Sequence, residues 1–303
     1  MSGGYEYVSA KSVLSETRYE ELIRFVDGFP GIETLLSQGW IAGGFVRMIL
    51  VERCSFSDYF TGSSPWLAGD VDFFFPSQET AHLATKTFKA SVMELEESAL
   101  FFPSKGGFTK EANVKSGSGQ VKVQIVDDKK MCFPTIEGCL DDFDFLNCRV
   151  GLRRHDGILQ FVIARGWREM EDAGLLHVMN NRAPFLGKRV MKYLQRRDLT
   201  GLSPGSADVI TGWLVNVSQG MFPGFKDCHV EGMHDMIKTL RAEKIVKDEH
   251  LIFFLNKWTE TKEERQGYGR VYIRNLGDWA LNEIDKVNGG TGRKNNIDEE
   301  EEW

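Results

Sequence analysis

The sequence predicts an α+β protein, with a mixed α/β first half and an α-helical second half. Up to about residue 165, short apolar runs bounded by Gly, Ser and Pro alternate with segments of helical periodicity. Beyond that point, most apolar runs have helical spacing. The chain has 303 residues, 42% of them hydrophobic, which is enough for a full core and favours two domains. We expect a first domain at 1–165, an α-helical domain at 166–288 and an acidic disordered tail at 289–303.

The first elements expected along the chain are a helix, a short strand and a second helix. Residues 17–38 carry apolar residues at roughly helical spacing, and this pattern stops at Gly39. The segment WIA at 40–42 is then a short buried strand. GGFVRMILVER, at 43–53, is a turn that opens a helix. Residues 53–68 are rich in Ser, Gly and aromatic residues without periodicity, which indicates a loop.

The next elements are a strand, a helix and a set of hairpins. DVDFFF, at 70–75, is a strand that ends at Pro76. Ser77 is a plausible N-cap for a helix over 77–98, with Glu79 in its first turn. From residue 100, short alternating runs split by Gly and Ser predict a sheet with hairpin turns. The segment 143–164 continues this pattern, with HDG as a turn between two strands.

The overall charge restricts the class of protein. A net charge of −7 argues against a protein that coats nucleic acid, because such binding depends on a basic face that releases counterions. Part of this charge lies in the last residues, NNIDEEEEW, and without Asp298 and Glu299–Glu302 the formal charge is about −2. A local basic channel is therefore compatible with the composition.

The sequence shows no sign of a membrane span, a secretion signal or a disulfide framework. No stretch approaches about eighteen uninterrupted apolar residues, and the first residues lack a charged and then apolar signal pattern. We therefore expect a cytoplasmic protein, or one of the host cytoplasm if it is viral, without a membrane partner. The five cysteines are widely spaced and contain no CxxC pair, so free thiols are expected rather than disulfides or a zinc site.

Two aspartates inside the apolar strand at 70–75 are candidate metal ligands. Asp70 and Asp72 are two residues apart, so on a strand both carboxylates project from one face while Val71 and Phe73 point into the core. Two like charges on one face repel each other unless a cation or hydrogen-bond donors lie between them. A hard divalent cation such as Mg²⁺ satisfies both carboxylates and keeps open positions for substrate phosphates.

The two glycines before the predicted helix at 43–53 are a candidate phosphate site. Gly43 and Gly44 allow the backbone to approach a ligand closely, and the helix that follows offers free N–H groups and a positive dipole end. Arg47, about one turn into the helix, can add a charge-assisted contact to the phosphate.

A third acidic group would complete a site for two metal ions, which together activate an attacking hydroxyl and stabilise the leaving oxygen. The candidates lie in LDDFDFLNC, where Asp142 and Asp144 are expected to share a strand face. We favour Asp144, because the residues around it have the stronger strand pattern.

These residues resemble the nucleotidyltransferase superfamily that includes DNA polymerase beta. The similarity is to the branch of tRNA nucleotidyltransferases and bacterial poly(A) polymerases, which has a GG-x-V-R helix, a D-x-D strand and a later Asp-Phe followed closely by Asn. The matching residues here are Gly43, Gly44, Val46 and Arg47, then Asp70 and Asp72, then Asp144, Phe145 and Asn147. The chain looks most like predicted nucleotidyltransferases of bacteriophages, in which VQIV and a later R-x-x-KY-x-x-R recur. The corresponding residues are Gln124, Arg189, Lys192, Tyr193 and Arg196.

The resemblance covers roughly residues 38–198 and implies a small mixed sheet flanked by helices, followed by a helical domain. It also implies transfer of a nucleoside monophosphate from an NTP such as ATP to a hydroxyl, with the 3′ end of an RNA as the expected acceptor and release of pyrophosphate. Mg²⁺ is the implied cofactor, with up to two ions and Mn²⁺ as a substitute. The implied nucleotide-binding residues are Gly43, Gly44, Arg47, Arg189, Lys192 and Arg196, and the implied metal ligands and catalytic residues are Asp70, Asp72 and Asp144.

Two other functions stay open at the level of sequence. One is an inactive scaffold of the same fold that serves as a binding or structural protein, for example in a virus, because Met48 stands where the family commonly has Asp. The other is a transferase that modifies a protein or a small molecule, which the acidic total charge favours. The basic segment GKRVMKYLQRR fits a triphosphate or nucleic-acid channel and a solvated helix face equally well. The sequence leaves the oligomeric state open.

Overall fold

The computed structural model divides the chain into two compact units, which are described separately. The first comprises Met1–Met179 and Arg196–Gly201, and the second comprises Asn180–Gln195 and Leu202–Trp303. The structure describes residues 4–52, 54–61, 70–93, 101–103, 109–116, 119–182, 186–195 and 199–218. Among these residues, no helix is long and apolar enough to cross a membrane.

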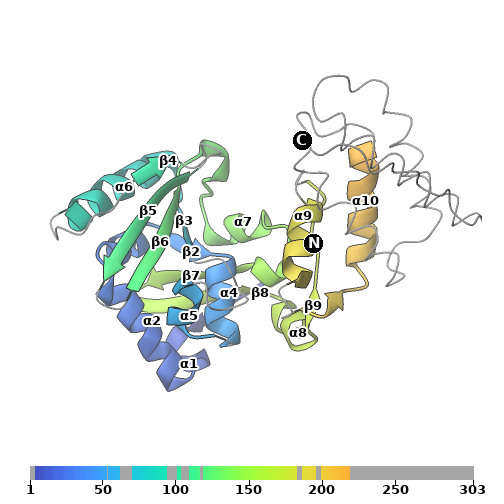
Figure 1. The fold of residues 1–303 in the computed structure, drawn as a ribbon, viewed down its shortest axis with the longest axis horizontal. Helices are drawn as coiled ribbons and strands as arrows, with labels where there is room; N and C mark the ends of the chain where they lie inside the picture. The colour runs from blue at the N-terminus through green and yellow to red at the C-terminus, as the bar shows by residue number, and fades with distance from the viewer. Residues whose placement is uncertain are drawn as a thin grey trace, which may run out of the picture. The chain divides into compact units, whose positions relative to one another are not determined.

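The first unit contains an eight-stranded mixed sheet with the order β1-β8-β7-β2-β3-β6-β5-β4 (Figure 1). The pair β3 and β6 is parallel, and the other neighbouring pairs are antiparallel. The strands are β1 (Tyr5–Ser9), β2 (Trp40–Ala42), β3 (Asp70–Phe74), β4 (Phe101–Pro103), β5 (Thr109–Ser116), β6 (Gly119–Val126), β7 (Val150–His155) and β8 (Ile158–Ala164). The mixed α+β architecture expected from the sequence is therefore confirmed.

Eight α-helices and two short 3-10 helices are described in the same unit. They are α1 (Ala10–Val13), α2 (Glu16–Gly28), α3 (Ile32–Gln38), α4 (Gly44–Val51), α5 (Phe56–Thr61), α6 (Gln78–Met93), α7 (Ile136–Asp141) and α8 (Trp167–Asp172), with η1 (Lys129–Met131) and η2 (Leu146–Cys148). A separate two-stranded sheet pairs β9 (Leu175–Leu176) with β10 (Gly201–Leu202). The described part of the second unit contains α9 (Leu186–Gln195) and α10 (Ser206–Ser218).

The two faces of the large sheet are buried to different extents. One face carries Val71, Phe73, Val123 and Leu152, and it forms the main core with apolar residues of α2, α3, α4 and α6. The other face carries a smaller cluster, in which Trp40, Ala42, Phe74 and Val126 pack against Ile136, Cys139 and Leu140 of α7. The less covered face leaves room for polar residues beyond α7.

Several elements appear where local signals predict them. The strand at 40–42, the helix opened by the glycine pair and the strand that begins at Asp70 are β2, α4 and β3. Ser77 caps α6, because its Oγ accepts a hydrogen bond of 3.1 Å from the Thr80 N–H. The HDG segment is the turn between β7 and β8, with Asp156 and Gly157 at positive φ.

The single helix predicted over residues 17–38 is wrong, because the structure breaks it into α2 and α3. The break lies at Phe29, Pro30 and Gly31. Proline has no N–H for the helix and restricts the residue before it. Gly31 has a φ of 78° and lies against the ring of Phe88, so no larger residue fits there. Because the apolar spacing continues on both sides of the break, the sequence pattern did not reveal the break.

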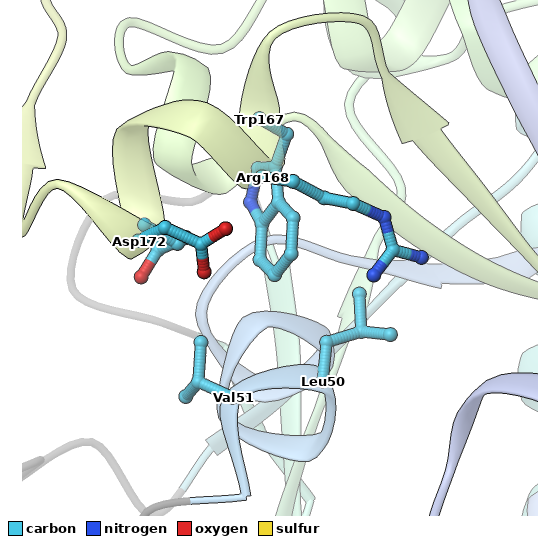
Figure 2. A pocket seen from close by; sticks show the side chains of 6 residues that line it. Leu50, Val51, Trp167, Arg168 and Asp172 are labelled. Carbon is cyan, nitrogen blue, oxygen red and sulfur yellow. The ribbon is translucent and has the colours of Figure 1, made fainter.

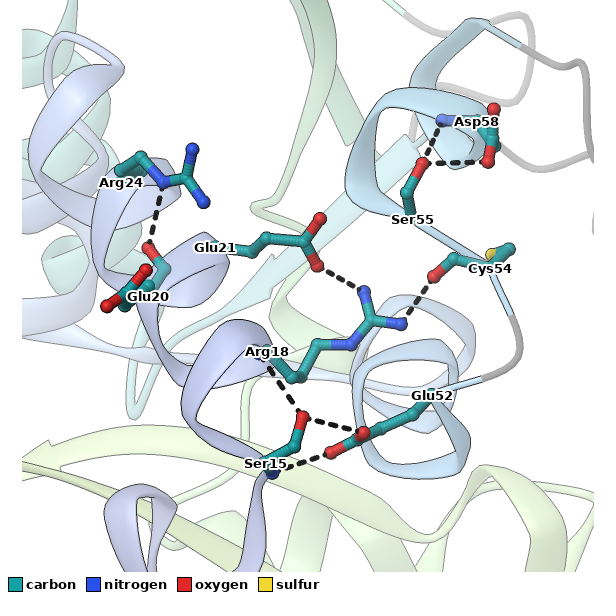
Figure 3. Close-up of polar contacts among 9 residues, drawn as sticks. All are labelled: Ser15, Arg18, Glu20, Glu21, Arg24, Glu52, Cys54, Ser55 and Asp58. Carbon is teal, nitrogen blue, oxygen red and sulfur yellow. Dashed lines mark hydrogen bonds and ion pairs between the residues drawn. The ribbon is translucent and has the colours of Figure 1, made fainter.

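The loop predicted for residues 53–68 is also wrong in its described part, because α5 occupies Phe56–Thr61. Ser55 caps this helix by accepting a 3.0 Å hydrogen bond from the Asp58 N–H (Figure 3). Its aromatic residues enter the core, with the Phe56 and Phe60 rings 5.6 and 5.7 Å from the Phe45 ring. Tertiary burial of these rings, rather than local periodicity, makes this segment helical.

The end of α4 is tied to the start of α2 by polar contacts (Figure 3). Glu52 follows α4 with a φ of 50°, and its carboxylate accepts hydrogen bonds of 2.9 Å from both the N–H and the hydroxyl of Ser15. Arg18 donates to Glu21 at 2.8 Å and also to the carbonyl oxygen of Cys54. These contacts fix the carboxyl end of α4 and leave its amino end to be positioned by the sheet.

Candidate active site

Asp70 and Asp72 lie on the same face of β3, as their spacing predicts. Both are half-buried, whereas Val71 and Phe73 between and after them are fully buried in the main core. Alternation along the strand therefore places both carboxylates on the face that also carries Phe74. Adjacent like charges at this position favour a bound cation or a neighbouring donor.

The parallel neighbour β6 brings two polar residues to the same face. In the ladder, Lys122 lies opposite Asp70 and Gln124 lies opposite Asp72. Val121, Val123 and Ile125 alternate with them and are fully buried in the main core, so Lys122 and Gln124 face the side of the aspartates. The prediction of the site omitted Lys122. The alternation of polar and apolar residues in GQVKVQIV is visible in the sequence and indicates the face on which Lys122 lies. The sequence does not indicate that Lys122 pairs with Asp70.

The turn that opens α4 requires glycine at Gly43, the residue before the first position of the helix. Gly43 has φ 87° and ψ −139°, and a Cβ built there would lie 2.8 Å from the ring of Phe143. Its N–H donates to the carbonyl of Val150 at 3.0 Å, which attaches the turn to β7. A Cβ at Gly44 would have no atom within 4 Å, so the space beside the helix start is open. Gly43 offers no side chain to cap the first-turn N–H groups, which are suited to an anion.

Arg47 has a partner that the sequence did not indicate. Its side chain is fully buried, and its Nε and an Nη donate to the two carboxylate oxygens of Glu171 at 2.6 and 2.8 Å. This bidentate pair joins α4 to α8 across 124 positions of sequence. Direct contact between Arg47 and a triphosphate stays a prediction, and it would require this pair to open.

The same glutamate also holds the segment that follows Asp144. Asn147 donates from its Nδ2 to Glu171 Oε1 at 2.7 Å and to the carbonyl of Leu175 at 3.1 Å. Its Oδ1 accepts from the His177 N–H at 2.9 Å, and its own carbonyl accepts from the Trp167 indole. Glu171 therefore connects two sequence motifs through Arg47 and Asn147. No spacing rule identifies it, since both partners are remote in sequence.

The strand expected around Asp142 and Asp144 is wrong. Asp142 is the exposed residue at the end of α7, and Asp144 is a buried residue in the bend before η2, so the two do not share a strand face. The hydrogen bonds of Asn147 favour the 3-10 turn over an extended chain. Phe143 packs with its ring 5.8 Å from that of Phe74 and in contact range of Gly43. The segment nevertheless lies over the face that carries the aspartates of β3.

A second buried arginine, Arg149, is hydrogen-bonded to the segment that contains Asp144. Arg149 donates to the carbonyl of Phe143 at 3.2 Å and to the carbonyl of Asp141 at 2.6 Å. Burial lowers the pKa of its guanidinium, although the nearby acidic groups, Asp142 and Asp144 among them, act in the opposite direction. Burial and the charge of Arg149 together lower the pKa of His177, which favours neutral imidazole. Arg149 is thus the counter-charge of the segment around Asp144.

The described residues test whether these groups suit a divalent metal ion. Among them, no three His, Cys, Asp or Glu side chains come together as a metal-binding group. Asp70 and Asp72 still provide two carboxylates on one face, and Mg²⁺ is commonly held by one or two carboxylates with phosphates and water completing its shell. The aspartate pair fits one such ion, whereas three converging protein carboxylates are not observed in this part of the chain.

A hollow of about 360 Å³ lies at the opposite end of α4 from the glycines (Figure 2). It is lined by Leu50, Val51, Trp167, Arg168, Glu171 and Asp172. Figure 2 shows the side chains of Arg168 and Asp172 on either side of the Trp167 ring. Because Glu171 is already paired with Arg47 and Asn147, this hollow borders the buried network rather than the aspartate face.

Two of the three basic residues expected after the third motif lie in the second unit. Arg189 and Lys192 are exposed on α9, while Leu186, Val190 and Tyr193 of the same helix are buried. The two basic residues are three positions apart, so they share one side of the helix. Arg196 lies outside the residues that the structure describes.

Comparison with known proteins gives a likeness in structure but not in sequence. No family model matches the sequence, and no curated protein matches it. The chain is similar to a solved CCA-adding enzyme in complex with CTP, with a TM-score of 0.50 and 14% identity over 94% of this chain and 70% of that one. The protein therefore has the α+β fold of a nucleotidyltransferase, and at this identity the likeness concerns the fold alone.

Two further solved structures are more distant. One is a tRNA nucleotidyltransferase with a primer tRNA and an incoming ATP analogue, at a TM-score of 0.45 and 14% identity, covering 88% of this chain and 75% of that one. The other is a CCA-adding enzyme in an apo form, at a TM-score of 0.45 and 14% identity, covering 92% and 69%.

Proposed function

We propose that this protein is a metal-dependent nucleotidyltransferase that moves a nucleoside monophosphate from an NTP to a hydroxyl and releases pyrophosphate. The observation that carries this proposal is the pair Asp70 and Asp72 on one face of β3, within a fold similar to that of a CTP-bound CCA-adding enzyme. The open space beside Gly44 at the start of α4 supports it.

Asp70 and Asp72 are the proposed ligands of Mg²⁺, with Mn²⁺ as a substitute. Their carboxylate oxygens are the type of ligand that these hard cations prefer. When bound, the ion would neutralise negative charge on the phosphate oxygens. The aspartates would hold it from a strand whose neighbouring residues are buried in the core, so both carboxylates are in position before the reaction.

Gly43 and Gly44 are the proposed binding residues for the triphosphate. The positive φ of Gly43 turns the chain into α4, and the first-turn N–H groups are oriented for an anion. Arg47 supports this turn through its pair with Glu171. The protein thereby contributes positioning and charge neutralisation for in-line attack on the α-phosphate.

Asp144 is proposed to act on the attacking hydroxyl as a base, because among the described residues its carboxylate does not converge with those of Asp70 and Asp72 on a metal position. It is buried, and its segment packs over the aspartate face through Phe143. Its backbone carbonyl accepts from the Met179 N–H at 2.7 Å, which holds the bend in place. The backbone at Asp144 is thus held by the surrounding chain rather than by a strand.

The proposed acceptor is the 3′ end of an RNA. The motif resemblance to tRNA nucleotidyltransferases and to the predicted enzymes of bacteriophages supports this choice. The exposed Arg189 and Lys192, with Arg196 in the sequence after them, supply positive charge for a phosphate backbone. ATP is the first nucleotide to test, followed by the other NTPs.

The test is incubation of the purified protein with each labelled NTP, Mg²⁺ and either RNA or a protein extract, followed by measurement of pyrophosphate and labelled product. Asp72→Ala should abolish transfer while the protein stays folded, because it removes a ligand and relieves repulsion. Asp156→Asn, an exposed aspartate in the β7–β8 turn, is the matched control and should keep full activity. Full activity of Asp72→Ala would refute the assignment, and label in protein instead of RNA would change the acceptor.

The second candidate is an inactive scaffold of the same fold. The absence of a three-ligand metal group among the described residues favours it, as does the burial of Arg47 in its pair with Glu171. Calorimetry with NTP and Mg²⁺ separates the two candidates, since a scaffold that lost its site would bind no nucleotide.

A further inference from the structure

A lysine stands beside the aspartate pair on the neighbouring strand. Lys122 is opposite Asp70 in the parallel ladder between β3 and β6, and Gln124 is opposite Asp72. The partners on the opposite face, Val71 and Val123, are both fully buried in the main core. This register shows that Lys122 and Gln124 project from the same face as the two aspartates.

Neighbouring strands are about 4.8 Å apart, so side chains opposite each other on one face can reach the same bound ion. A site for two divalent ions needs a further carboxylate within this reach, because the two ions bring four positive charges close together. At the two adjacent positions this chain has an ammonium and a neutral amide. The ammonium has three donors and no acceptor, so it cannot be a metal ligand.

The remaining candidate for a further carboxylate is Asp144, which is a buried residue in the bend before η2 and does not lie on a strand beside Asp70. Arg149 adds positive charge to this segment through its ion pair of 3.3 Å with Asp141 and its hydrogen bonds to the carbonyls of Asp141 and Phe143. Within the described residues, no three acidic, His or Cys side chains converge on a metal position. The position beside Asp70 is therefore occupied by the positive charge of Lys122 and not by a third carboxylate.

We propose that the site holds a single divalent ion, at Asp70 and Asp72, and that the ammonium of Lys122 takes the place and charge of a second ion. This inference rests on the proposed function, because that function supplies the NTP that binds beside the ion. Like charges exclude a second cation from the position of Lys122, and the same ammonium is a donor to triphosphate oxygens. The structure thereby distinguishes this site from one in which two ions carry the charge.

The test counts Mn²⁺ ions per chain by electron paramagnetic resonance, with and without a non-hydrolysable NTP analogue. The wild-type protein should bind one ion per chain in the presence of the analogue. Lys122→Glu, which supplies the missing carboxylate, should bind one ion more than the wild type in both conditions. Lys86→Glu is the matched control, because Lys86 is exposed on α6, which covers the opposite face of the sheet.

Lys122→Met keeps the proposal testable if Lys122→Glu does not fold, as judged by near-ultraviolet circular dichroism. It should bind no additional Mn²⁺ but should bind the analogue about tenfold more weakly, the effect of losing about 1.4 kcal/mol of charge-assisted contact. Two ions per wild-type chain would overturn the proposal, and so would analogue binding that is unchanged in Lys122→Met.

The outcome also separates this inference from the proposed function. If the wild type binds no analogue, the proposed function fails, whereas the count without nucleotide still decides the role of Lys122. Equal Mn²⁺ counts for the wild type and a folded Lys122→Glu variant would overturn that role even in an active enzyme.

Discussion

The buried pair of Arg47 and Glu171 leads to a prediction about stability. Arg47→Met removes two hydrogen bonds of 2.6 and 2.8 Å and leaves a carboxylate with 4% exposure and only Asn147 as its remaining donor among these contacts. Hydrogen bonds to charged groups contribute about 1.5–3 kcal/mol each, and breaking a buried ion pair from one side costs about 3–5 kcal/mol. We expect the free energy of unfolding to fall by about 3–5 kcal/mol.

The measurement is urea denaturation followed by tryptophan fluorescence and far-ultraviolet circular dichroism, accepted where both transitions coincide. Glu33→Gln is the control, because its ion pair with Arg154 is 26% and 48% exposed and should contribute less than about 1 kcal/mol. The double variant Arg47→Met with Glu171→Met should recover much of the loss, since no buried charge is left unpaired.

A cost of Arg47→Met no larger than that of Glu33→Gln would refute the reasoning. A double variant whose cost equals the sum of the two single variants would also contradict it, because contacting partners must be coupled.

Three further predictions concern the turn at α4, a buried thiol and a surface hydrogen bond. Gly43→Ala should cost about 1–3 kcal/mol in denaturation because of its positive φ and the nearby ring of Phe143, and an unchanged midpoint would contradict this. Burial raises the pKa of Cys139 from 9.0 to about 12. The folded state therefore keeps the proton longer than the unfolded state, and stability should be complete below about pH 9 and decrease as the pH rises towards 12. Cys139→Ala should reduce this slope in denaturation at pH 8 and pH 10, whereas Cys132 and Tyr5, whose pKa values burial also raises, still contribute. Although burial acts to raise it, the pKa of Glu137 is lowered because the Tyr7 hydroxyl and other donors stabilise the carboxylate. Tyr7→Phe should raise this pKa in a carboxyl NMR titration, and an unmoved value would show that the hydrogen bond is not formed in solution.

The elements with strong local signals could be predicted from the sequence. The glycine pair before an apolar run predicts the turn into α4, and Ser77 before Glu79 predicts the start of α6. The break at Pro30 and the helix α5 were missed for different reasons. Pro30 interrupts an apolar pattern that continues on both sides, whereas α5 depends on aromatic packing with Phe45, which no local window contains.

For the candidate site, prediction was limited by pairings between distant segments. The shared face of Asp70 and Asp72 follows from their spacing alone, since a strand alternates its side chains. The bend at Asp144 is formed because Asn147 bonds to Glu171 and Leu175, which are 24 and 28 positions away. Strand propensity calculated over a few residues contains no information about partners that are distant in the sequence.

The amino-acid sequence by itself determined the mixed α+β class, the turn at Gly43 and the common face of the two aspartates, because these depend on local periodicity and on backbone freedom. Only the tertiary structure decided that Lys122 lies beside Asp70, that Glu171 neutralises Arg47 and that Arg149 supports the segment of Asp144. The physical reason is that burial leaves a charged group dependent on whichever counter-charge the fold places beside it, and strand order and register set that neighbour.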